Sequence, residues 1–244
     1  MRVHAAAPPV FERLFTWLGA ALFFVSLAYC VFSYVATFGV PAAGRDRAPA
    51  VAWNVTLFTL FAVHHSVCAR ERVRRWVTRL VPAPIERSFY VWIASLILIA
   101  VCALWRPVRG VAWDAEGTAL WALRLLQATG VWLSLRSVGI LGIRELAGVT
   151  PLVARRFQPA QASGSAFTTT GPYGWVRHPI YTGWFLMVFA AAPMTMTRLV
   201  FAAVSCAYLL IAIPFEERSM RASAAGAYER YMAQVRWRLL PGVY

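Results

Sequence analysis

Two polar clusters near the end of the chain contain residue types that could bind a charged ligand. Arg177 and His178 lie in the first cluster, which runs from Gly171 to Gly183, and the second begins at Glu216-Glu217. The segment between the clusters is almost wholly apolar. Ionisable groups beside such a segment are costly to keep and usually mark a functional site. A membrane hairpin would bring the Arg-His and Glu-Glu pairs together at one water interface.

Each cluster suggests a binding mode of its own. Pro179 predicts the start of a helix, because proline is favoured in the first turn, where its missing N–H costs nothing. The free N–H groups of that turn could hold a carboxylate or a phosphate. Glu216 and Glu217 are two adjacent acids beside an apolar run, which suggests a cationic partner. That cation could be Arg177, in a purely structural ion pair, or a ligand with an ammonium or sulfonium charge.

Composition predicts an all-α integral membrane protein. The chain has 244 residues, of which 60% are hydrophobic, and its long uncharged runs are typical of membrane helices. The net charge of +14 comes from arginine alone, because the chain has no lysine. The arginines lie in loops beside apolar runs, which favours anionic lipid headgroups over nucleic acid as partners. The four cysteines lie inside apolar runs without a CxxC pair, so we expect no metal site.

We expect a polytopic bundle of about six membrane helices, the last two forming a short hairpin. About 20 residues cross a bilayer, so the shorter hairpin could be tilted, or re-entrant with four crossings in total. Arginine-rich loops predict cytoplasmic N- and C-termini, and we expect the inner membrane of a bacterium. The expected spans are Leu14–Phe38, Val51–Ala69, Ser88–Trp105, Thr118–Ile143, Ile180–Ala192 and Leu199–Phe215.

The remaining segments predict parts that could cover a site. Val149–Thr170 contains proline, glycine and small polar residues, which indicates an irregular cytoplasmic connection that could act as a flap. Glu216–Val235 has apolar residues at helical spacing, so we expect a cytoplasmic helix that folds back over the site. We expect residues 1–244 to form one domain, with a four-span bundle over residues 1–143 and a cofactor-binding part over residues 144–244.

The two clusters resemble those of the isoprenylcysteine carboxyl methyltransferase and phospholipid methyltransferase superfamily. The resemblance extends through Gly226, Tyr228, Tyr231 and Pro241, and covers roughly the last third of the chain. It implies a membrane enzyme that uses S-adenosylmethionine, with Glu216 or Glu217 holding the ribose hydroxyls or the amino group. The cofactor contacts that it implies are Tyr173, Arg177, His178, Pro179, Tyr181, Gly183, Glu216, Glu217, Tyr228 and Tyr231.

The N-terminal half resembles the nurim-like branch, which includes bacterial methanethiol S-methyltransferases and a haem-dependent zeta-carotene isomerase. The matching residues are 64–70 and 86–91, whereas residues 136–149 do not obviously match the thiol enzymes. His65 could be a haem ligand, could orient the acceptor, or could be a packed residue bonded to another helix. Arg136 lies deep in its expected span, so we expect it to face the bundle interior.

The sequence thus predicts an S-adenosylmethionine-dependent membrane methyltransferase whose acceptor is a small or lipophilic thiol, carboxylate or lipid. Arg177, Arg136 and His65 are the catalytic candidates, since a nearby arginine would favour a reactive thiolate. Two alternatives remain. One is a haem-b-dependent isomerase that uses His65 and His178, and the other is a non-catalytic membrane accessory protein.

Overall fold

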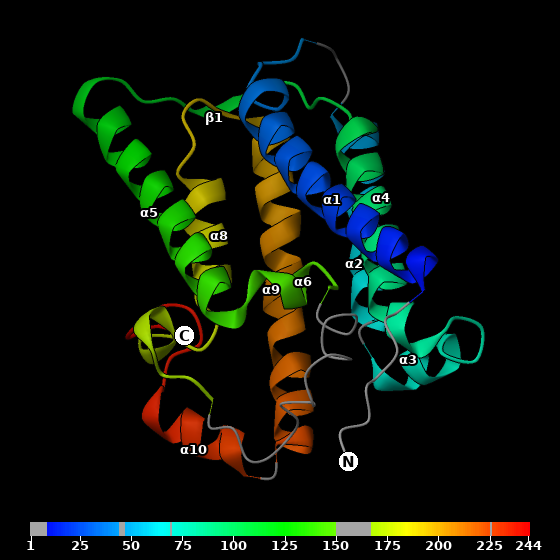
Figure 1. The fold of residues 1–244 in the computed structure, drawn as a ribbon. Coiled ribbons are helices and arrows are strands. Elements are labelled where there is room, and N and C mark those ends of the chain that lie inside the picture. Colours follow the sequence, from blue (N-terminus) through cyan, green and yellow to red (C-terminus); the bar gives the residue numbers. More distant parts are fainter. Residues whose placement is uncertain (1–8, 44–46, 69, 150–166, 225) are drawn as a thin grey trace, which may run out of the picture. The chain divides into compact units, whose positions relative to one another are not determined.

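Helices form nearly all of the regular structure in the part of the chain that is described (Figure 1). The structure is a computed structural model that describes residues 9–43, 47–68, 70–149, 167–224 and 226–244. Most of the expected flap, residues 150–166, therefore lies outside the described residues.

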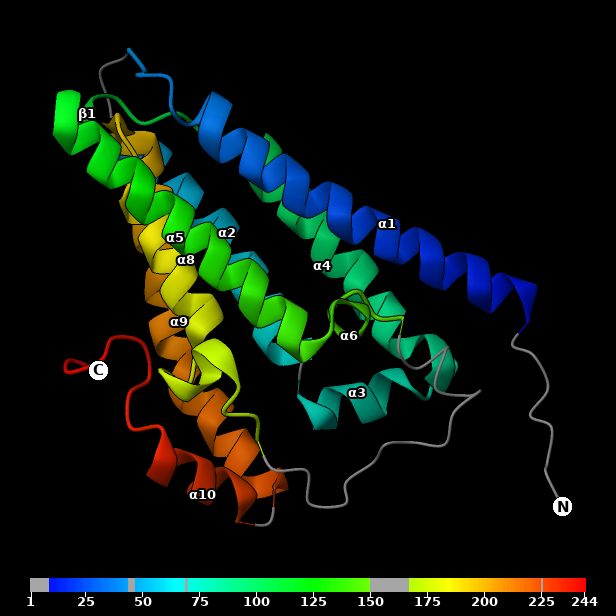
Figure 2. The same ribbon diagram turned by 60° about the vertical axis from the view of Figure 1, so that its left-hand side comes forward.

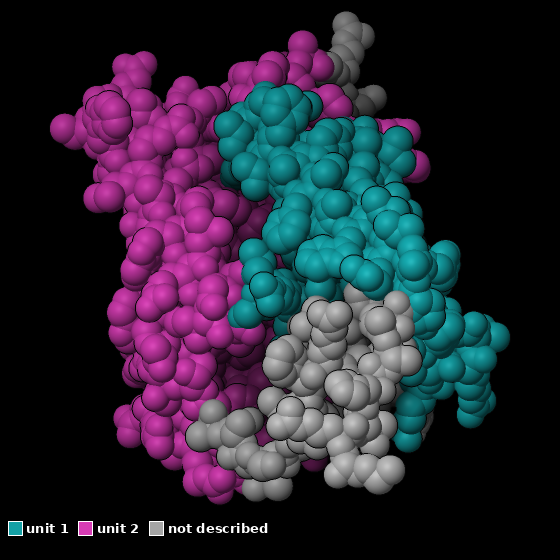
Figure 3. Space-filling view, viewed as in Figure 1, with its two compact units in different colours: residues 1–37, 56–105, 142–161 teal, residues 38–55, 106–141, 162–244 magenta. Residues whose placement is uncertain are grey.

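The chain divides into two compact units, coloured separately in Figure 3. Each unit is assembled from three separate stretches of the sequence. The first contains residues 1–37, 56–105 and 142–161, and the second contains residues 38–55, 106–141 and 162–244.

In the first unit, α1 packs along α4, as both ribbon views show (Figures 1 and 2). The Ser88 hydroxyl lies 3.1 Å from Thr16 Oγ1 and 3.0 Å from the Gly148 carbonyl oxygen. Trp92 Nε1 donates to the Phe15 carbonyl at 3.0 Å. These bonds satisfy polar groups inside an otherwise apolar interface. The helices of this unit are α1 (Val10–Phe32, followed by a π-helical stretch, Ser33–Thr37), the later part of α2 (Ala48–Cys68), α3 (Glu71–Val77), a 3-10 turn (Ala83–Ile85), α4 (Glu86–Ala103) and α6 (Ile143–Leu146).

The second unit contains both polar clusters. Its two short strands pair antiparallel, and α5 and α8 run side by side (Figures 1 and 2). Besides the early part of α2, its elements are β1 (Val111–Trp113), α5 (Gly117–Leu141), a 3-10 turn (Gly171–Gly174), α8 (Pro179–Phe189), β2 (Met194–Thr195), α9 (Met196–Ser223) and α10 (Ala227–Gln234).

Two glycines allow the close approach of α5 and α8. A Cβ atom on Gly130 would lie 2.5 Å from the Gly183 carbonyl oxygen, and one on Gly183 would lie 2.6 Å from the Gly130 carbonyl oxygen. Only residues without a Cβ fit at such distances. Small residues at helix contacts are typical of proteins that pack within a bilayer.

Buried polar bonds tie residues 38–55 into the second unit. The Asn54 side chain, which is fully buried, donates to the Arg106 carbonyl and accepts from the Arg106 N–H, both at 2.8 Å. The Thr195 hydroxyl donates to the Phe38 carbonyl and also caps α9 by accepting the Arg198 N–H at 3.1 Å. The segment before α2 is thus fixed to the start of α9, and the early part of α2 is fixed to the chain before β1.

The expected tail helix Glu216–Val235 is divided in the structure. Residues 216–223 continue α9, and α10 begins only at Ala227. Gly226 has a φ of +80°, a left-handed conformation that favours glycine and interrupts a helix. The prediction of one continuous helix was therefore wrong. Apolar residues keep their helical spacing on both sides of Gly226, so the spacing alone does not reveal the break in the backbone.

Within the described residues, four helices are long and apolar enough to cross a membrane: Val10–Thr37, Ala48–Cys68, Ala83–Ala103 and Met196–Ser223. The helix α8, with 11 residues, is shorter than a span. The helix α5 is 25 residues long but is not among the four, and it carries Arg124 and Arg136. The predicted class of helical membrane protein is confirmed in this coarse form, while six crossings and a cytoplasmic C-terminal helix stay predictions.

Candidate functional site

The first cluster lies alongside the C-terminal tail of the chain, which consists of residues 235–244 after α10. As predicted, Pro179 starts a helix, α8, and no side chain caps its first turn. Arg177 and His178 form the link before it. Their backbone N–H groups donate to the carbonyls of Trp237 and Arg238, at 2.8 and 2.9 Å. The tail therefore holds this link by main-chain hydrogen bonds.

Glu217 is a buried carboxylate surrounded by cationic side chains. Its side chain is 2% exposed, and it accepts from Arg177 Nε at 2.8 Å and from Arg238 Nε at 3.1 Å. His178 Nε2 lies 3.3 Å from the same carboxylate. Arg177 also donates to the carbonyls of residues 235 and 236. Since two guanidinium groups compensate its charge, Glu217 holds the tail and the link together. Its contact with a cofactor stays a prediction.

Glu216 has a different environment from its neighbour. Its side chain is 41% exposed, and it accepts a hydrogen bond from the Tyr181 hydroxyl at 2.5 Å. His178 Nδ1 lies 3.8 Å away, and within the described residues no arginine forms an ion pair with Glu216. The Glu216 carboxylate thus keeps capacity for a further cation.

A cavity of about 290 Å³ opens beside Glu216. It lies wholly within the second unit, and its walls come from α5, α8, α9, α10 and the segments before α8. The lining residues are Leu141, Phe167, Thr168, Tyr173, Arg177, His178, Pro179, Ile180, Tyr181, Glu216, Met220, Tyr228 and Tyr231.

Aromatic rings form one wall of this cavity. The Phe167 ring packs against Tyr228 and Tyr231, with centroids 4.9 and 5.7 Å apart. The Tyr231 hydroxyl donates to the Tyr173 carbonyl at 2.8 Å. Burial raises the pKa of Tyr231 to about 12, and burial also raises the pKa values of Tyr173 and Tyr228. The wall therefore presents neutral phenol rings at physiological pH.

Most of the predicted cofactor contacts meet at this cavity, and two do not line it. Glu217 is bonded to the cations described above, and Gly183 faces α5, where it permits close helix packing. The predicted residues that do line the cavity are Tyr173, Arg177, His178, Pro179, Tyr181, Glu216, Tyr228 and Tyr231.

Arg136 does not face the bundle interior, so that prediction was wrong. The buried face of α5 contains Gly130, Leu133 and Ser137, at helical spacing. Arg136 is exposed, because adjacent residues on a helix point about 100° apart and Ser137 already occupies the buried face. Its depth in the apolar run did not reveal which side of the helix it occupies.

His65 belongs to the first unit, while the cavity belongs to the second. His65 Nδ1 lies 2.6 Å from the Tyr90 hydroxyl on α4, and its ring stacks on Phe61. A bond to a neighbouring helix favours the reading of His65 as a packed polar residue.

Sequence reasoning missed Arg238 and Phe167. Arg238 is one of two arginines on Glu217, and it also donates to the Tyr244 hydroxyl at 2.9 Å. In the sequence, Arg238 is only one of several arginines after residue 215, so nothing distinguished it from the others. Phe167 lies within the expected flap, Val149–Thr170, and has no periodic pattern around it.

Comparison with known proteins identifies a family match in the part of the chain that contains both polar clusters. The model of the isoprenylcysteine carboxyl methyltransferase family matches residues 156–222, which contain both clusters. Methanethiol S-methyltransferase 1 of Bradyrhizobium diazoefficiens is 36% identical, covering 96% of this chain and 86% of that protein. The methanethiol S-methyltransferase of Mycobacterium tuberculosis is 37% identical, covering 88% and 89%. Human nurim is 28% identical, covering 74% and 72%. No solved structure gives a significant match.

The helical membrane fold and these similarities define an integral membrane methyltransferase. The chain belongs to the isoprenylcysteine carboxyl methyltransferase family, with nurim-like features, and the bacterial relatives named above are methanethiol S-methyltransferases. The predicted resemblance is confirmed, and the haem-dependent alternative is not favoured.

Proposed function

We propose that the protein transfers a methyl group from S-adenosylmethionine to a small thiol such as methanethiol, at the cavity beside Glu216. The observation that carries this proposal is the contrast between the two glutamates. Glu217 is compensated by arginines, while Glu216 lines an aromatic cavity and has no arginine partner in the contacts described above. The thiol follows from the names of relatives that match nearly the whole chain.

The donor groups of the cavity fit S-adenosylmethionine. A carboxylate and phenol rings attract a cation such as a sulfonium, through charge and through the ring faces. Glu216 and the three tyrosines of the aromatic wall provide both. The first turn of α8 lines the same cavity, and its uncapped N–H groups suit the carboxylate of the cofactor. When bound, this cofactor supplies the electrophilic methyl group.

The remaining polar residues would position the site. Arg177 donates to Glu217 and to two tail carbonyls, and its side chain is 8% exposed. Because these donors are already in use, we assign Arg177 to holding the link before α8 rather than to stabilising a thiolate. Methyl transfer depends mainly on alignment of the reactants and on exclusion of water, so a rigid link contributes to the rate.

We also infer that the cavity faces the cytoplasm of a bacterial cell, with both termini on that side. The loop 70–87, the stretch 144–177 and the tail after residue 215 are rich in arginine. Basic loops stay on the cytoplasmic side of the membrane. S-adenosylmethionine would then reach the cavity from the cytoplasm.

Cofactor binding by purified protein in detergent tests the role of Glu216. Titration calorimetry with S-adenosylmethionine should show binding by the wild type and a loss of about tenfold or more in affinity for Glu216→Gln, since a hydrogen bond to a charged group contributes about 1.5–3 kcal/mol. Glu229→Gln is the matched control, because Glu229 is exposed on α10 and should bind normally. Wild-type protein without measurable binding would remove the proposal.

The acceptor is tested separately with labelled methyl donor and methanethiol. The label should appear in volatile dimethyl sulfide. Label in the lipid or protein fraction instead would keep the methyltransferase and overturn the thiol acceptor.

A further inference from the structure

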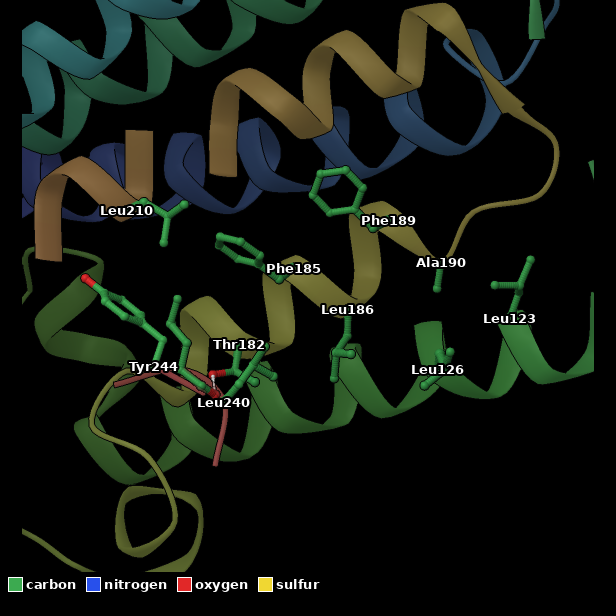
Figure 4. A pocket seen from close by; sticks show the side chains of 11 residues that line it. Leu123, Leu126, Thr182, Phe185, Leu186, Phe189, Ala190, Leu210, Leu240 and Tyr244 are labelled. Carbon is green, nitrogen blue, oxygen red and sulfur yellow. Dashed lines mark hydrogen bonds between the residues drawn. The ribbon is translucent and has the colours of Figure 1, made fainter. Parts of the chain in front are cut away.

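The second unit contains another cavity, which none of the steps above uses. It has a volume of about 430 Å³ and is seen from close by in Figure 4. It shares no lining residue with the cavity beside Glu216. We call it the apolar pocket, and its walls include Leu126 of α5, Phe185, Leu186 and Phe189 of α8, Leu210 of α9, and Leu240 of the tail.

The apolar pocket offers a polar ligand few side-chain partners. Thr182 and Tyr244 have the only hydroxyl groups among its lining residues. The Thr182 hydroxyl donates to the Leu239 carbonyl at 2.8 Å, and the Tyr244 hydroxyl accepts from Arg238 at 2.9 Å. Burying a polar ligand here would cost its hydration and replace few of its hydrogen bonds. A hydrocarbon occupant, by contrast, would gain from burial.

The pocket is elongated along α8. Its lining runs from Thr182 to Ala190, which at 1.5 Å per residue corresponds to about 12 Å along the helix axis. One leaflet of the hydrocarbon core is about 15 Å thick, half of the whole core. Leu210 belongs to the candidate membrane span Met196–Ser223. The pocket thus has a length that suits a chain within one leaflet, and one of its walls belongs to a candidate span.

Arginines lie at both ends of the pocket. Arg124 donates to the Ala192 carbonyl at 3.1 Å, just beyond Ala190. At the other end, Arg238 bonds to Tyr244. A guanidinium group at the end of an apolar pocket suits the phosphate of a lipid whose acyl chain fills the pocket.

We propose that the apolar pocket binds an acyl chain of a membrane phospholipid. The pocket is a lipid site distinct from the cofactor cavity, and this assignment does not depend on the methyl acceptor. Phospholipid is the occupant because the walls are hydrocarbon, one wall is a membrane span and the length fits a single leaflet.

Photolabelling in vesicles tests this site. The full chain is reconstituted in phosphatidylcholine vesicles that contain a share of phosphatidylcholine with a diazirine on one acyl chain. After irradiation, mass spectrometry should find lipid adducts on Phe185, Leu186 and Leu210. Leu126→Trp, which fills the pocket, should reduce these adducts several-fold. Leu125→Trp is the matched control, because Leu125 is 69% exposed on the same helix and does not line the pocket.

A second filling variant, Leu123→Trp, covers the case in which Leu126→Trp does not fold, as judged by circular dichroism. Adducts that are equal in both filling variants and in the control would overturn the proposal, and so would protein–protein cross-links at the pocket in place of lipid adducts. S-adenosylhomocysteine should leave the labelling unchanged, and displacement of the lipid by it would assign the pocket to the cofactor. Calorimetry on the same preparation reports the cofactor cavity independently.

Discussion

Glu216 and Glu217 differ at the scale of single residues because neighbours on a helix point about 100° apart. One carboxylate reaches the arginines of the link and the tail, and the other reaches the cavity. The sequence identified both acids and Arg177 as a possible partner of them. It did not divide their roles, because the second arginine, Arg238, follows Glu217 by 21 residues and nothing periodic connects them.

Replacing Arg238 should weaken the site indirectly. Arg238→Gln leaves the buried Glu217 with one arginine fewer, and we expect a loss of about 1–2 kcal/mol in stability, discounted because Arg238 is 30% exposed. We also expect a several-fold rise in the dissociation constant for S-adenosylmethionine, with partial recovery in Arg238→Lys. Thermal unfolding and calorimetry measure the two effects. Arg236→Gln, an exposed neighbour with the same charge, is the control, and equal losses in both variants would contradict this role.

Tyr231 predicts a pH dependence of stability. Burial raises its pKa in the folded protein to about 12, while the unfolded chain titrates near pH 10. Its contribution is fully present below about pH 10 and is lost as the pH rises towards 12, because the unfolded state releases the proton first. Tyr231→Phe should be about 1 kcal/mol less stable at neutral pH, through the lost hydrogen bond, but its stability should fall less steeply above pH 10. Melting temperatures that fall equally in both proteins from about pH 8 to pH 12 would contradict this prediction.

At the scale of elements, the sequence predicted helices well where apolar runs are long. The expected spans Thr118–Ile143 and Ile180–Ala192 correspond to α5 and α8, within a few residues at each end. The glycine contact that fixes their packing was not predicted. Gly183 belongs to the recognised motif and was assigned to the cofactor, because one sequence does not show which side of a helix meets which neighbour.

The packing of α5 on α8 can be tested with two glycines of α5. Gly130→Ala should destabilise the protein by about 1–3 kcal/mol, because the added methyl would overlap the α8 backbone. Gly139→Ala meets nothing within 4 Å and should be neutral or slightly stabilising, since alanine favours helix. Thermal unfolding in the same detergent compares them, and an undisturbed melting temperature for Gly130→Ala would show that the helices are farther apart.

At the scale of the whole molecule, the two compact units do not follow the order of the chain. The sequence suggested a bundle over residues 1–143 and a cofactor-binding part over residues 144–244, and that the whole chain works as one domain stays a prediction. The second unit instead takes residues 38–55 and 106–141 along with the polar clusters. Buried contacts such as Asn54 with Arg106 create this arrangement, and a single sequence has no signal for them.

Asn54 offers a test of this arrangement. Asn54→Ala removes both hydrogen bonds to the backbone of Arg106, so we expect a loss of about 1–3 kcal/mol, at about 0.5–1.5 kcal/mol for each bond. Because Asn54 belongs to the unit that contains the cofactor cavity, S-adenosylmethionine should raise the melting temperature of the variant by as much as that of the wild type. Thr59→Ala, at an exposed position of the same helix, should melt like the wild type. Equal melting of the two variants would contradict the role of Asn54.

The unequal surroundings of the acidic doublet have a consequence for genetics. Loss of the enclosed Glu217 should reduce how much protein accumulates in the cell, because two arginines would lose their counter-charge. Loss of Glu216 should leave a normal amount of inactive protein. A mutational survey that scored abundance and product formation separately would therefore place two adjacent, identical letters in opposite phenotypic classes.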